Sequence, residues 1–469
     1  MTPLLSDDTI CALATAVGGA MAIIRISGSK AISVTDKFFV SPRGKKLVTM
    51  SSNTVHYGEM QDDGGEVIDD VVVSIFRNPH SYTGEDTVEI CCHGSRYIIT
   101  LLLQRLISLG CRQAGPGEFT QRAFLNGKLD LSQAEAVADL ISSTNASTHK
   151  MALSQLRGNF SHQLADLRDH LLHLTSLLEL ELDFSDHEDL EFADRSELLA
   201  LAQTTERQIA ALSNSFSTGK ALRQGIAVAI VGKTNVGKST LLNRLLHDDK
   251  AIVSDIHGTT RDVIEDTTQI GGVTFRFIDT AGIRATADAI ERLGIERTYQ
   301  KLDEAAIVLW MTDTPPSLEE VSDILQRTKD KKLIAIVNKI DKTVQATYNP
   351  LAPTPPYQAD IVLEVPIIPI SAKKGTNIEQ LENAIYQAAD IPSITQNDVI
   401  VTHLRHYEAL AKAHDDIFRV ETGLQNGLSG DLLSEDLRVC IDHLSEIVGG
   451  TITPDETLGN IFSHFCVGK

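Results

Sequence analysis

The chain has 469 residues, of which 42% are apolar and 22% charged, and its formal net charge is −21. The length suggests about three domains, and the acidic balance excludes a protein that binds phosphate backbones over its whole surface. No apolar run reaches the length of a membrane span and no secretory pattern begins the chain, so we expect a cytoplasmic protein without a membrane partner. The six cysteines lack metal-ligand spacing and disulfide density, so we expect reduced thiols.

Residues 1–124 show the pattern of a mixed α/β domain. The runs 20–26 and 67–75 are rich in apolar and β-branched residues, and glycine and proline signals bound them. Both runs therefore predict strands, and we expect one folded domain ahead of the change in pattern near residue 125.

Residues 125–222 and 391–469 carry helical patterns. Apolar residues recur at every third or fourth position, as on the buried stripe of an amphipathic helix, in two sets: Leu164, Leu167, Leu171, Leu174 and Leu178, then Leu433, Leu437, Ile441, Leu444 and Val448. Each stripe needs a partner, so we expect one discontinuous helical domain; two separate helical domains are the alternative. The acidic run 179–197 is interpreted as a solvated helix end and loop.

Residues 223–390 alternate strand-like and helical runs, as in a doubly wound, mostly parallel sheet. The expected strands are 226–231, 273–278, 305–311, 333–338 and 366–370. Because such sheets bind ligands beyond the carboxyl ends of their strands, the residues that follow these runs are the candidates for a site.

A phosphate-binding loop follows the first of these strands. It reads Gly232-Lys-Thr-Asn-Val-Gly-Lys-Ser239 and leads into an apolar helical run. Glycines let consecutive N–H groups point into one concavity, and the helix adds its positive dipole end, so the loop predicts a phosphate site. Lys238 would reach the terminal phosphates and take part in catalysis, and the Ser239 hydroxyl would bind Mg²⁺.

Three further motifs follow strand ends, namely Asp279-Thr-Ala-Gly282, Asn338-Lys-Ile-Asp341 and Ser371-Ala-Lys373. The Asp279 carboxylate suits the Mg²⁺ shell, and the Asp341 carboxylate can accept the N–H groups of guanine, which adenine cannot offer. The order of motifs therefore predicts GTP rather than ATP. The expected GTP contacts are Asn235, Val236, Gly237, Lys238, Ser239, Thr240, Ser254, Asp255, Ile256, His257, Gly258, Thr259, Thr260, Asp279, Thr280, Ala281, Gly282, Asn338, Lys339, Asp341, Ser371, Ala372 and Lys373.

The segment 254–262 can supply a hydroxyl to Mg²⁺ only when the γ-phosphate is present, which predicts a switch. Ile283 stands where many signalling GTPases have a glutamine that orients water. Hydrolysis therefore needs another group, and the Glu291 carboxylate is a candidate, although the residues alone favour a solvent-facing helix position for Glu291.

The whole chain resembles the MnmE (TrmE) family of tRNA modification GTPases. The resemblance rests on the motif order above and on Ile24-Arg-Ile-Ser-Gly28, Ser81-Tyr-Thr-Gly-Glu-Asp86, His93-Gly94, Pro116-Gly-Glu-Phe-Thr120, Arg122-Ala-Phe-Leu-Asn-Gly-Lys-Leu-Asp-Leu131 and the ending Phe465-Cys-Val-Gly-Lys469. One loop departs from the pattern, because Ala16-Val-Gly-Gly-Ala20 is shorter and lacks the family's arginine. The resemblance implies an α/β folate-binding-like domain, a discontinuous helical domain and an inserted GTPase domain.

The resemblance also implies cofactors. The amino-terminal domain would form a homodimer and bind 5-formyltetrahydrofolate or a related tetrahydrofolate through Arg25, Glu89, Lys128 and Lys469. Considered without the resemblance, Arg25 and Lys128 are interpreted as surface charges and Glu89 as a strand residue. Cys466, in the terminal tail, would belong to a functional tail folded into the folate site and is included among the catalytic candidates, although the residues leave its chemistry open.

For the GTPase domain, the resemblance implies hydrolysis stimulated by K⁺ when two such domains meet. The K⁺ ligands would be Asn235, Ser254, Ile256 and Thr259, and the Mg²⁺ ligands Ser239 and Thr260. Glu291 matches the family's water-positioning carboxylate, and K⁺ would place positive charge where an arginine finger acts.

The activity implied is GTP hydrolysis coupled to tRNA modification. With the flavin-dependent protein MnmG, in a heterotetramer, the enzyme would form a 5-carboxymethylaminomethyl or aminomethyl group on the wobble uridine of tRNA. Two alternatives remain open from the residues: a regulatory GTPase bound to RNA or ribosomes, and a folate-binding or structural protein with a vestigial GTP site. The intact Lys238, Ser239, Asp279 and Asp341 argue against the second alternative.

Overall fold

The computed structural model describes residues 8–183, 195–247, 266–278, 304–342, 365–392, 394–395, 397–450, 458, 461–463, 465 and 467–468. The chain divides into two compact units. Unit 1 comprises Met1–Ser142, Ala152–Ser213 and Leu404–Lys469, and unit 2 comprises Ser143–Met151 and Asn214–His403. No described helix combines the length and apolar character that a membrane span requires.

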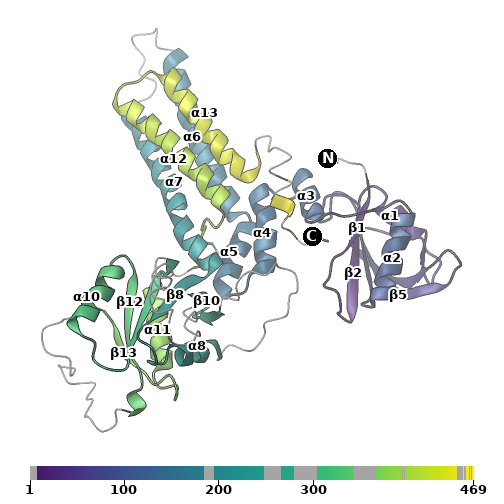
Figure 1. Ribbon diagram of the computed structural model, residues 1–469. Coiled ribbons are helices and arrows are strands. Elements are labelled where there is room, and N and C mark those ends of the chain that lie inside the picture. The colour runs from purple at the N-terminus through teal and green to yellow at the C-terminus, as the bar shows by residue number, and fades with distance from the viewer. Residues whose placement is uncertain are drawn as a thin grey trace, which may run out of the picture. The chain divides into compact units, whose positions relative to one another are not determined.

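The amino-terminal part of unit 1, coloured purple in Figure 1, is built on a sheet. Its seven described strands have the order β3-β4-β5-β6-β2-β1-β7. All pairs are antiparallel except β1 with β7. The expected strands at 20–26 and 67–75 are confirmed as β2 and β5. The strands are β1 (Ile10–Leu13), β2 (Met21–Ser27), β3 (Phe39–Val40), β4 (Thr54–Gln61), β5 (Val67–Phe76), β6 (Thr87–His93) and β7 (Arg112–Gln113).

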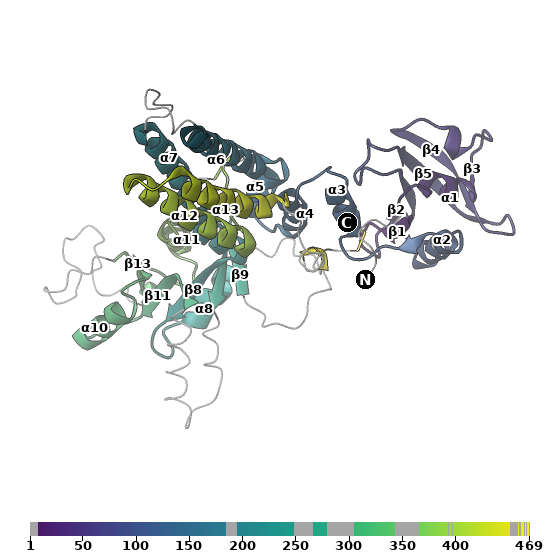
Figure 2. The ribbon, with the colours of Figure 1, turned by 90° about the horizontal axis from the view of Figure 1, so that it is seen from above.

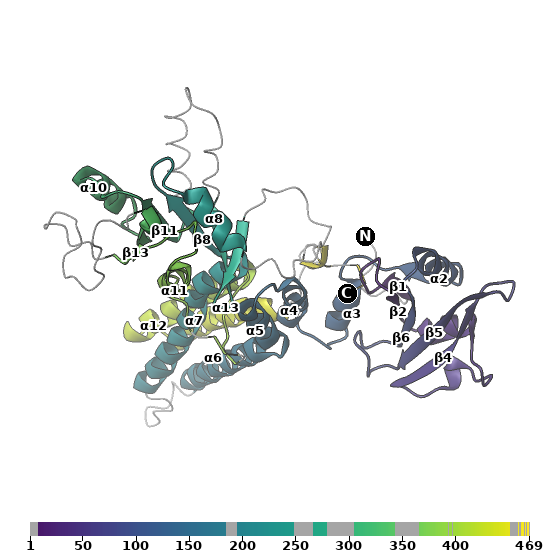
Figure 3. The same cartoon turned by 90° about the horizontal axis from the view of Figure 1, so that it is seen from below.

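Two helices of this part, α1 (Ala31–Asp36) and α2 (Arg96–Ser108), pack against the sheet, and Figure 3 shows α2 beside its strands. Alternate strand residues such as Ile24, Val73 and Ile90 form the buried core with them. The intervening residues point to the other face, which we call the open face and define by Arg25, Glu89, Cys91, Val72 and Tyr57. The short helices η1 (Leu47–Thr49) and α3 (Glu118–Leu125) complete this part.

The helical part of unit 1 joins segments from both sides of the inserted unit 2. Helix α13 packs against α6 and α12, although the long segment Asn214–His403 of unit 2 separates α6 from α13 in the sequence (Figure 2). The expected discontinuous helical domain is confirmed. Its helices are α4 (Leu131–Ser142), α6 (Asn159–Asp183), α12 (Leu404–Gln425) and α13 (Gly430–Val448), with the second part of α5 (Ala146–Leu156) and most of α7 (Arg195–Gln224). The start of α5 and the end of α7 belong to unit 2.

The five leucines of the expected α6 stripe are all buried, each at most 3% exposed. The stripe expected on α13 is wrong in part. Its buried residues are Leu433, Leu437, Cys440, Leu444 and Ile447, whereas Ile441 and Val448 are only half-buried. The spacing fits either set, and the neighbours of α13 on two sides select the set that includes the small Cys440.

Unit 2 contains a six-stranded sheet of described strands in the order β13-β12-β11-β8-β10-β9. All pairs are parallel except β9 with β10, so the expected doubly wound, mostly parallel sheet is confirmed. Its strands are β8 (Ile226–Val231), β9 (Asp266–Ile270), β10 (Val273–Ile278), β11 (Ile307–Thr312), β12 (Lys332–Val337) and β13 (Ile367–Pro369), and its helices include α8 (Lys238–His247), α10 (Leu318–Arg327), η3 (Ile340–Lys342) and α11 (Ile378–Ala388).

Strand β8 is buried at every position because apolar layers cover both faces of the sheet. This central strand fixes the point from which the phosphate loop leaves. The site is therefore anchored to a strand that is buried along its whole length.

Candidate nucleotide-binding site

The phosphate loop lies between β8 and α8, as the sequence predicts. Gly232 has φ 154° and Gly237 has φ 105°, values that favour glycine. A Cβ at Gly232 would lie 2.2 Å from the Met311 carbonyl oxygen, and a Cβ at Gly237 would lie 2.4 Å from Asn338 Nδ2. Both glycines are thus required by close packing against the neighbouring strands as well as by their dihedral angles.

Lys238 begins α8, and its ammonium group turns back over the loop. Its Nζ donates to the carbonyl oxygens of Gly232 at 2.6 Å and Lys233 at 2.7 Å. Burial lowers the pKa of Lys238. The group is held at the concave side of the loop, where a phosphate would meet both the ammonium and the N–H groups of the helix start. Ser239 and Thr240 follow in the first turn of α8 and are exposed.

Asn338 connects the phosphate loop to the loop after β13. Its side-chain Nδ2 donates to the Val236 carbonyl oxygen at 2.7 Å, and its Oδ1 accepts from the Ala372 N–H at 3.0 Å. The residue is only 5% exposed, so both bonds form away from water. Asn338 therefore sets the distance between the segment predicted to hold phosphates and the segment predicted to hold the base.

Lys339 makes a second connection. Its Nζ donates to the Asn235 carbonyl oxygen at 2.7 Å and pairs with Asp313 Oδ2 at 2.6 Å. Asp313 was missed by the sequence reasoning. The signal was available, because Asp313 directly follows β11 and lies at the same edge of the sheet as the predicted residues.

Asp341 is oriented by the neighbouring loop. Ser371 Oγ donates to Asp341 Oδ1 at 2.8 Å and also accepts from the Lys374 N–H at 3.2 Å. The hydrogen bond from Ser371 lowers the pKa of Asp341, so its carboxylate stays ionised and can accept N–H groups of a base. The carbonyl oxygen of Lys373 in this loop accepts from Arg244 Nη2 at 3.2 Å, a contact that the sequence did not indicate.

Other predicted residues of the nucleotide and folate sites lie outside the described residues. They are Ser254, Asp255, Ile256, His257, Gly258, Thr259, Thr260, Asp279, Thr280, Ala281, Gly282, Glu291, Cys466 and Lys469. The described residues of the nucleotide site come together at one edge of the sheet, and their roles toward GTP stay predictions.

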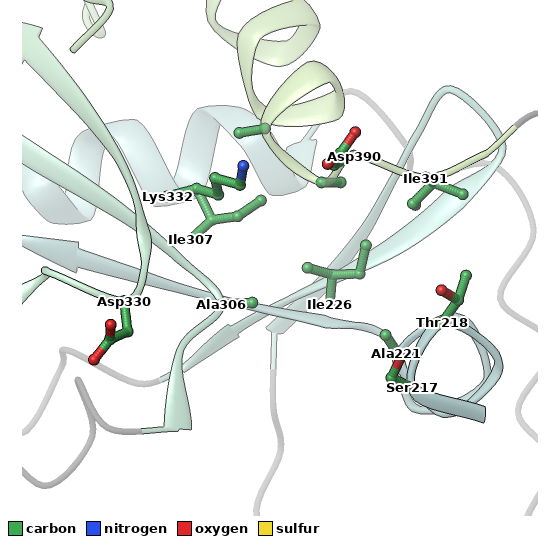
Figure 4. Close-up of a pocket in the computed structure, with 12 residues that line it drawn as sticks. Ser217, Thr218, Ala221, Ile226, Ala306, Ile307, Asp330, Lys332, Asp390 and Ile391 are labelled. Atoms are coloured by element: carbon green, nitrogen blue, oxygen red, sulfur yellow. The ribbon is translucent and has the colours of Figure 1, made fainter. Parts of the chain in front are cut away.

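The opposite edge of the same sheet holds a cavity of about 330 Å³ (Figure 4). It opens where β8, β11 and β12 begin, and its lining includes Ile226, Ile307 and Lys332. None of the predicted site residues lines this cavity. The two edges of the sheet therefore have separate surroundings.

The predicted folate residues lie on the amino-terminal sheet of unit 1. Arg25 and Glu89 stand opposite each other on β2 and β6, and Arg25 Nη2 lies 2.8 Å from Glu89 Oε1. Arg25 Nη1 also donates to the Gly468 carbonyl oxygen at 3.3 Å, and the guanidinium carbon lies 5.4 Å from the Tyr82 ring centroid and 5.7 Å from the Phe119 ring centroid. The arginine is thus paired, and its partner Glu89 is half-buried.

Lys128 belongs to a different neighbourhood of the same part. Its exposed Nζ donates to the Pro79 carbonyl oxygen at 3.1 Å, and its side chain lies beside Gly84. The terminal tail reaches this part of the chain, because Val467 pairs with Pro116 in an antiparallel bridge. The structure therefore places Gly468 at Arg25, as expected of a tail folded toward the predicted site.

Comparison with known proteins agrees with this architecture. Residues 131–466 match the model of the MnmE helical domain, and residues 9–128 match the model of the GTP-binding protein TrmE N-terminus. The chain belongs to the MnmE family. It is 56% identical over 470 residues to the tRNA modification GTPase MnmE of Bacteroides fragilis (strain YCH46), covering 99% of this chain and 100% of that protein.

Other MnmE relatives are similar over the same extent. The tRNA modification GTPase MnmE of Phocaeicola vulgatus is 54% identical over 503 residues, and that of Flavobacterium johnsoniae is 46% identical over 474 residues. Each alignment covers 99% of this chain and 100% of the relative. The match to the MnmE family therefore extends over all three parts of the fold.

Proposed function

We propose that this chain is a K⁺-stimulated GTP hydrolase of the cytoplasm that acts on tRNA. With the flavoprotein MnmG, it forms the 5-carboxymethylaminomethyl or aminomethyl group on the wobble uridine. The observation that carries the nucleotide part is that Asn338 donates to the Val236 carbonyl oxygen and accepts from the Ala372 N–H, which joins the predicted phosphate loop to the predicted base loop. MnmE relatives bear the printed name tRNA modification GTPase, which supports the tRNA part.

The described residues fit the cations that the proposal requires. Asn235 is exposed at φ 63° on the rim of the phosphate loop, and Ser239 is exposed in the first turn of α8. Amide and hydroxyl oxygens are suitable ligands for Mg²⁺ and K⁺. Such ions would supply positive charge beside the transferring phosphate. The chain's own contribution is to hold the phosphates with backbone N–H groups and Lys238 and to hold the base with Asp341.

The open face of the amino-terminal sheet supports a folate site and a homodimer. The Arg25–Glu89 pair offers a donor and an acceptor beside the Tyr82 and Phe119 rings, which suits a flat ring with polar edges. Across four strands, Ile23, Cys91, Val72 and Tyr57 stand opposite one another in one row. Tyr57 is 58% exposed, so this apolar row suits the same face of a second copy.

One pair of measurements tests the proposal. The GTPase rate should be higher in K⁺ than in Na⁺ salts, and Asn235→Ala should remove the difference while GTP still binds. Mass spectrometry of wobble uridines from cells that lack the gene should show loss of the modification, restored by the wild-type gene. Equal rates in both salts would contradict the K⁺ mechanism, and unchanged tRNA would leave a regulatory GTPase as the better description.

A further inference from the structure

The amino-terminal part contains a basic segment within an acidic protein. Residues 9–58 include six lysines or arginines and a single acidic residue, Asp36, whereas the whole chain has a net charge of −21. Five of the six cations are exposed and follow one another over 17 residues. We call these five, Lys30, Lys37, Arg43, Lys45 and Lys46, the basic edge.

The fold brings four of these cations, Lys37, Arg43, Lys45 and Lys46, to one border of the sheet, whereas Lys30 lies at the other end of α1, where its N–H donates to Thr9 Oγ1 at 3.1 Å. Strand β3 is the last strand in the sheet order, and α1 contacts both β3 and η1 (Figure 2). The Asp36 carboxylate accepts the Leu47 N–H at 2.5 Å, and this bond ties the end of α1 to the start of η1. The backbone segments that carry Lys37 and Lys46, the sequence neighbours of these two residues, are thereby held close together.

A tight turn presents the next cation. The Gly44 N–H donates to the Ser41 carbonyl oxygen at 2.9 Å, and Gly44 has φ 64°. Serine, proline and glycine occupy turn positions that favour them, so Arg43 lies within a rigid turn. Lys30 and Lys37 flank α1, and seven residues at 1.5 Å each separate them by about 10 Å. The basic edge is therefore an extended and preformed surface.

The surroundings do not neutralise this charge. No described carboxylate forms an ion pair with any of the five cations. Asp36 uses a carboxylate oxygen for the Leu47 N–H. Arg77 adds a further positive charge nearby, because its Nη2 donates to the Val48 and Met50 carbonyl oxygens at 2.9 Å and 3.0 Å. The acidic residues Asp62, Asp63 and Glu66 lie in the β4–β5 hairpin, which adjoins the Lys37 end of β3, because the Gln61 N–H donates to the Phe38 carbonyl oxygen. The turn that carries Arg43, Lys45 and Lys46 follows the other end of β3.

We propose that the basic edge is a contact surface for the phosphate backbone of the tRNA substrate. This inference rests on the proposed function, because it takes tRNA as the partner. In an acidic protein, long-range repulsion opposes a polyanion, so binding requires a local surface of unneutralised cations. The basic edge meets this requirement and would position the RNA without reading its sequence.

Lysines also protect exposed sheet borders from pairing with other strands. That role needs few charges, and β3 is only two residues long, whereas the basic edge continues through α1 and the turn beyond the strand. Border protection alone does not account for five exposed cations. The experiment below separates the two roles.

The test compares two variants of the full chain with equal charge change. Arg43→Gln/Lys45→Gln/Lys46→Gln removes three cations of the basic edge, and Arg168→Gln/Lys220→Gln/Lys412→Gln removes three exposed cations of α6, α7 and α12. Binding of fluorescently labelled total tRNA is followed by anisotropy at several salt concentrations. We expect the first variant to bind about tenfold more weakly and to lower the salt slope by roughly 2, whereas the control matches the wild type.

Three results would overturn the inference. The basic-edge variant could bind tRNA with wild-type affinity and slope; the control could lose as much affinity; or the wild-type chain could fail to bind tRNA at about 50 mM salt. A basic-edge variant that binds normally but self-associates would assign these residues to border protection. GTPase rate and circular dichroism of both variants verify that they are folded.

Failure of the proposed function would look different. Wild-type cells and cells that lack the gene could have the same wobble uridines while the basic-edge variant still loses tRNA affinity. This result would support the contact surface and contradict the proposed modifying activity. If modification depends on the gene but the basic-edge variant binds tRNA as the wild type does, only the proposed contact surface is contradicted.

Discussion

The Asn338 side-chain amide donates to the Val236 carbonyl oxygen at 2.7 Å, across 102 residues of sequence. Because Asn338 is buried, Asn338→Ala leaves the Val236 oxygen and the Ala372 N–H without this partner. We expect a loss of about 1–3 kcal/mol in the free energy of unfolding and weaker binding of GDP. Chemical denaturation and isothermal calorimetry measure the two effects. The exposed Asn397→Ala is the control and should change stability by less than about 0.5 kcal/mol.

Gly232→Ala should abolish nucleotide binding. The new Cβ would lie 2.2 Å from the Met311 carbonyl oxygen, so the phosphate loop or β11 must move. Gly110→Ala is the matched control, because Gly110 also has positive φ, at 103°, but no atom lies within 4 Å of a Cβ there. The control should cost about 1 kcal/mol of stability and leave GDP affinity unchanged by calorimetry. If the Gly232→Ala and Gly110→Ala variants bind GDP with equal affinity, the backbone relieves the contact between the new Cβ and the Met311 carbonyl oxygen without disturbing the nucleotide site.

Glu135→Ala should destabilise unit 1 strongly. Glu135 is 5% exposed, and its Oε2 lies 2.6 Å from His406 Nε2 and 2.9 Å from Arg405 Nη2. Arg405 also donates to the carbonyl oxygens of Glu446 and Ile447 near the end of α13. Removing one partner of a buried ion pair costs about 3–5 kcal/mol.

Urea denaturation measures the Glu135→Ala effect. The control is Asp323→Ala, which removes the exposed i,i+4 pair with Arg327 on α10 and should cost less than about 0.5 kcal/mol. A decrease of less than about 1 kcal/mol in the free energy of unfolding of Glu135→Ala would contradict this expectation. It would show that water replaces the Glu135 carboxylate as the hydrogen-bond partner of Arg405 and His406.

The His93–Asp69 pair predicts a pH-dependent contribution to stability. The hydrogen bond between His93 Nδ1 and Asp69 Oδ1, at 2.7 Å, raises the pKa of His93. A histidine whose folded pKa lies above its unfolded value of about 6.5 stabilises the fold fully below that pH, and the contribution disappears as pH rises through the folded pKa.

Asp69→Asn tests this sign. The difference in melting temperature between wild type and Asp69→Asn should be larger at pH about 5.5 than at pH about 9, and the NMR titration of His93 should shift to lower pH in the variant. In the wild type, the backbone N–H of His93 donates to Asp69 Oδ2 at 2.8 Å. The side-chain oxygen of Asn in the variant can still accept this bond. If the pKa of His93 is the same in Asp69→Asn as in the wild type, Asp69 is not the cause of the raised pKa.

Val72→Asp should weaken the proposed homodimer. Val72 lies opposite Tyr57 and Cys91 on the open face, so a carboxylate there would be buried against its counterpart in a second copy. Analytical ultracentrifugation should find monomer where the wild type is dimer. Ile107→Asp on α2, 46% exposed, is the control and should remain dimeric. A monomeric wild type would contradict the homodimer itself.

Several features of this protein could be predicted from local sequence. A short continuous segment of the chain encodes each of three such features: strand β8, the phosphate loop and the α6 stripe. The periodicity or turn chemistry of that segment determines its backbone conformation. The partner of Lys339 was not predictable in this way. Asp313 and Lys339 follow the ends of the adjacent parallel strands β11 and β12, and their pairing depends on the register of these two strands.

The sequence alone determined the family, the order of the nucleotide motifs and the existence of two helical segments that need each other. Only the tertiary structure decided that Cys440 and Ile447 replace Ile441 and Val448 on the buried stripe of α13, and that Arg25 pairs with Glu89. The physical reason is the range of the interactions. Periodicity and turn chemistry act over a few residues, whereas burial and ion pairing depend on neighbours contributed by distant segments.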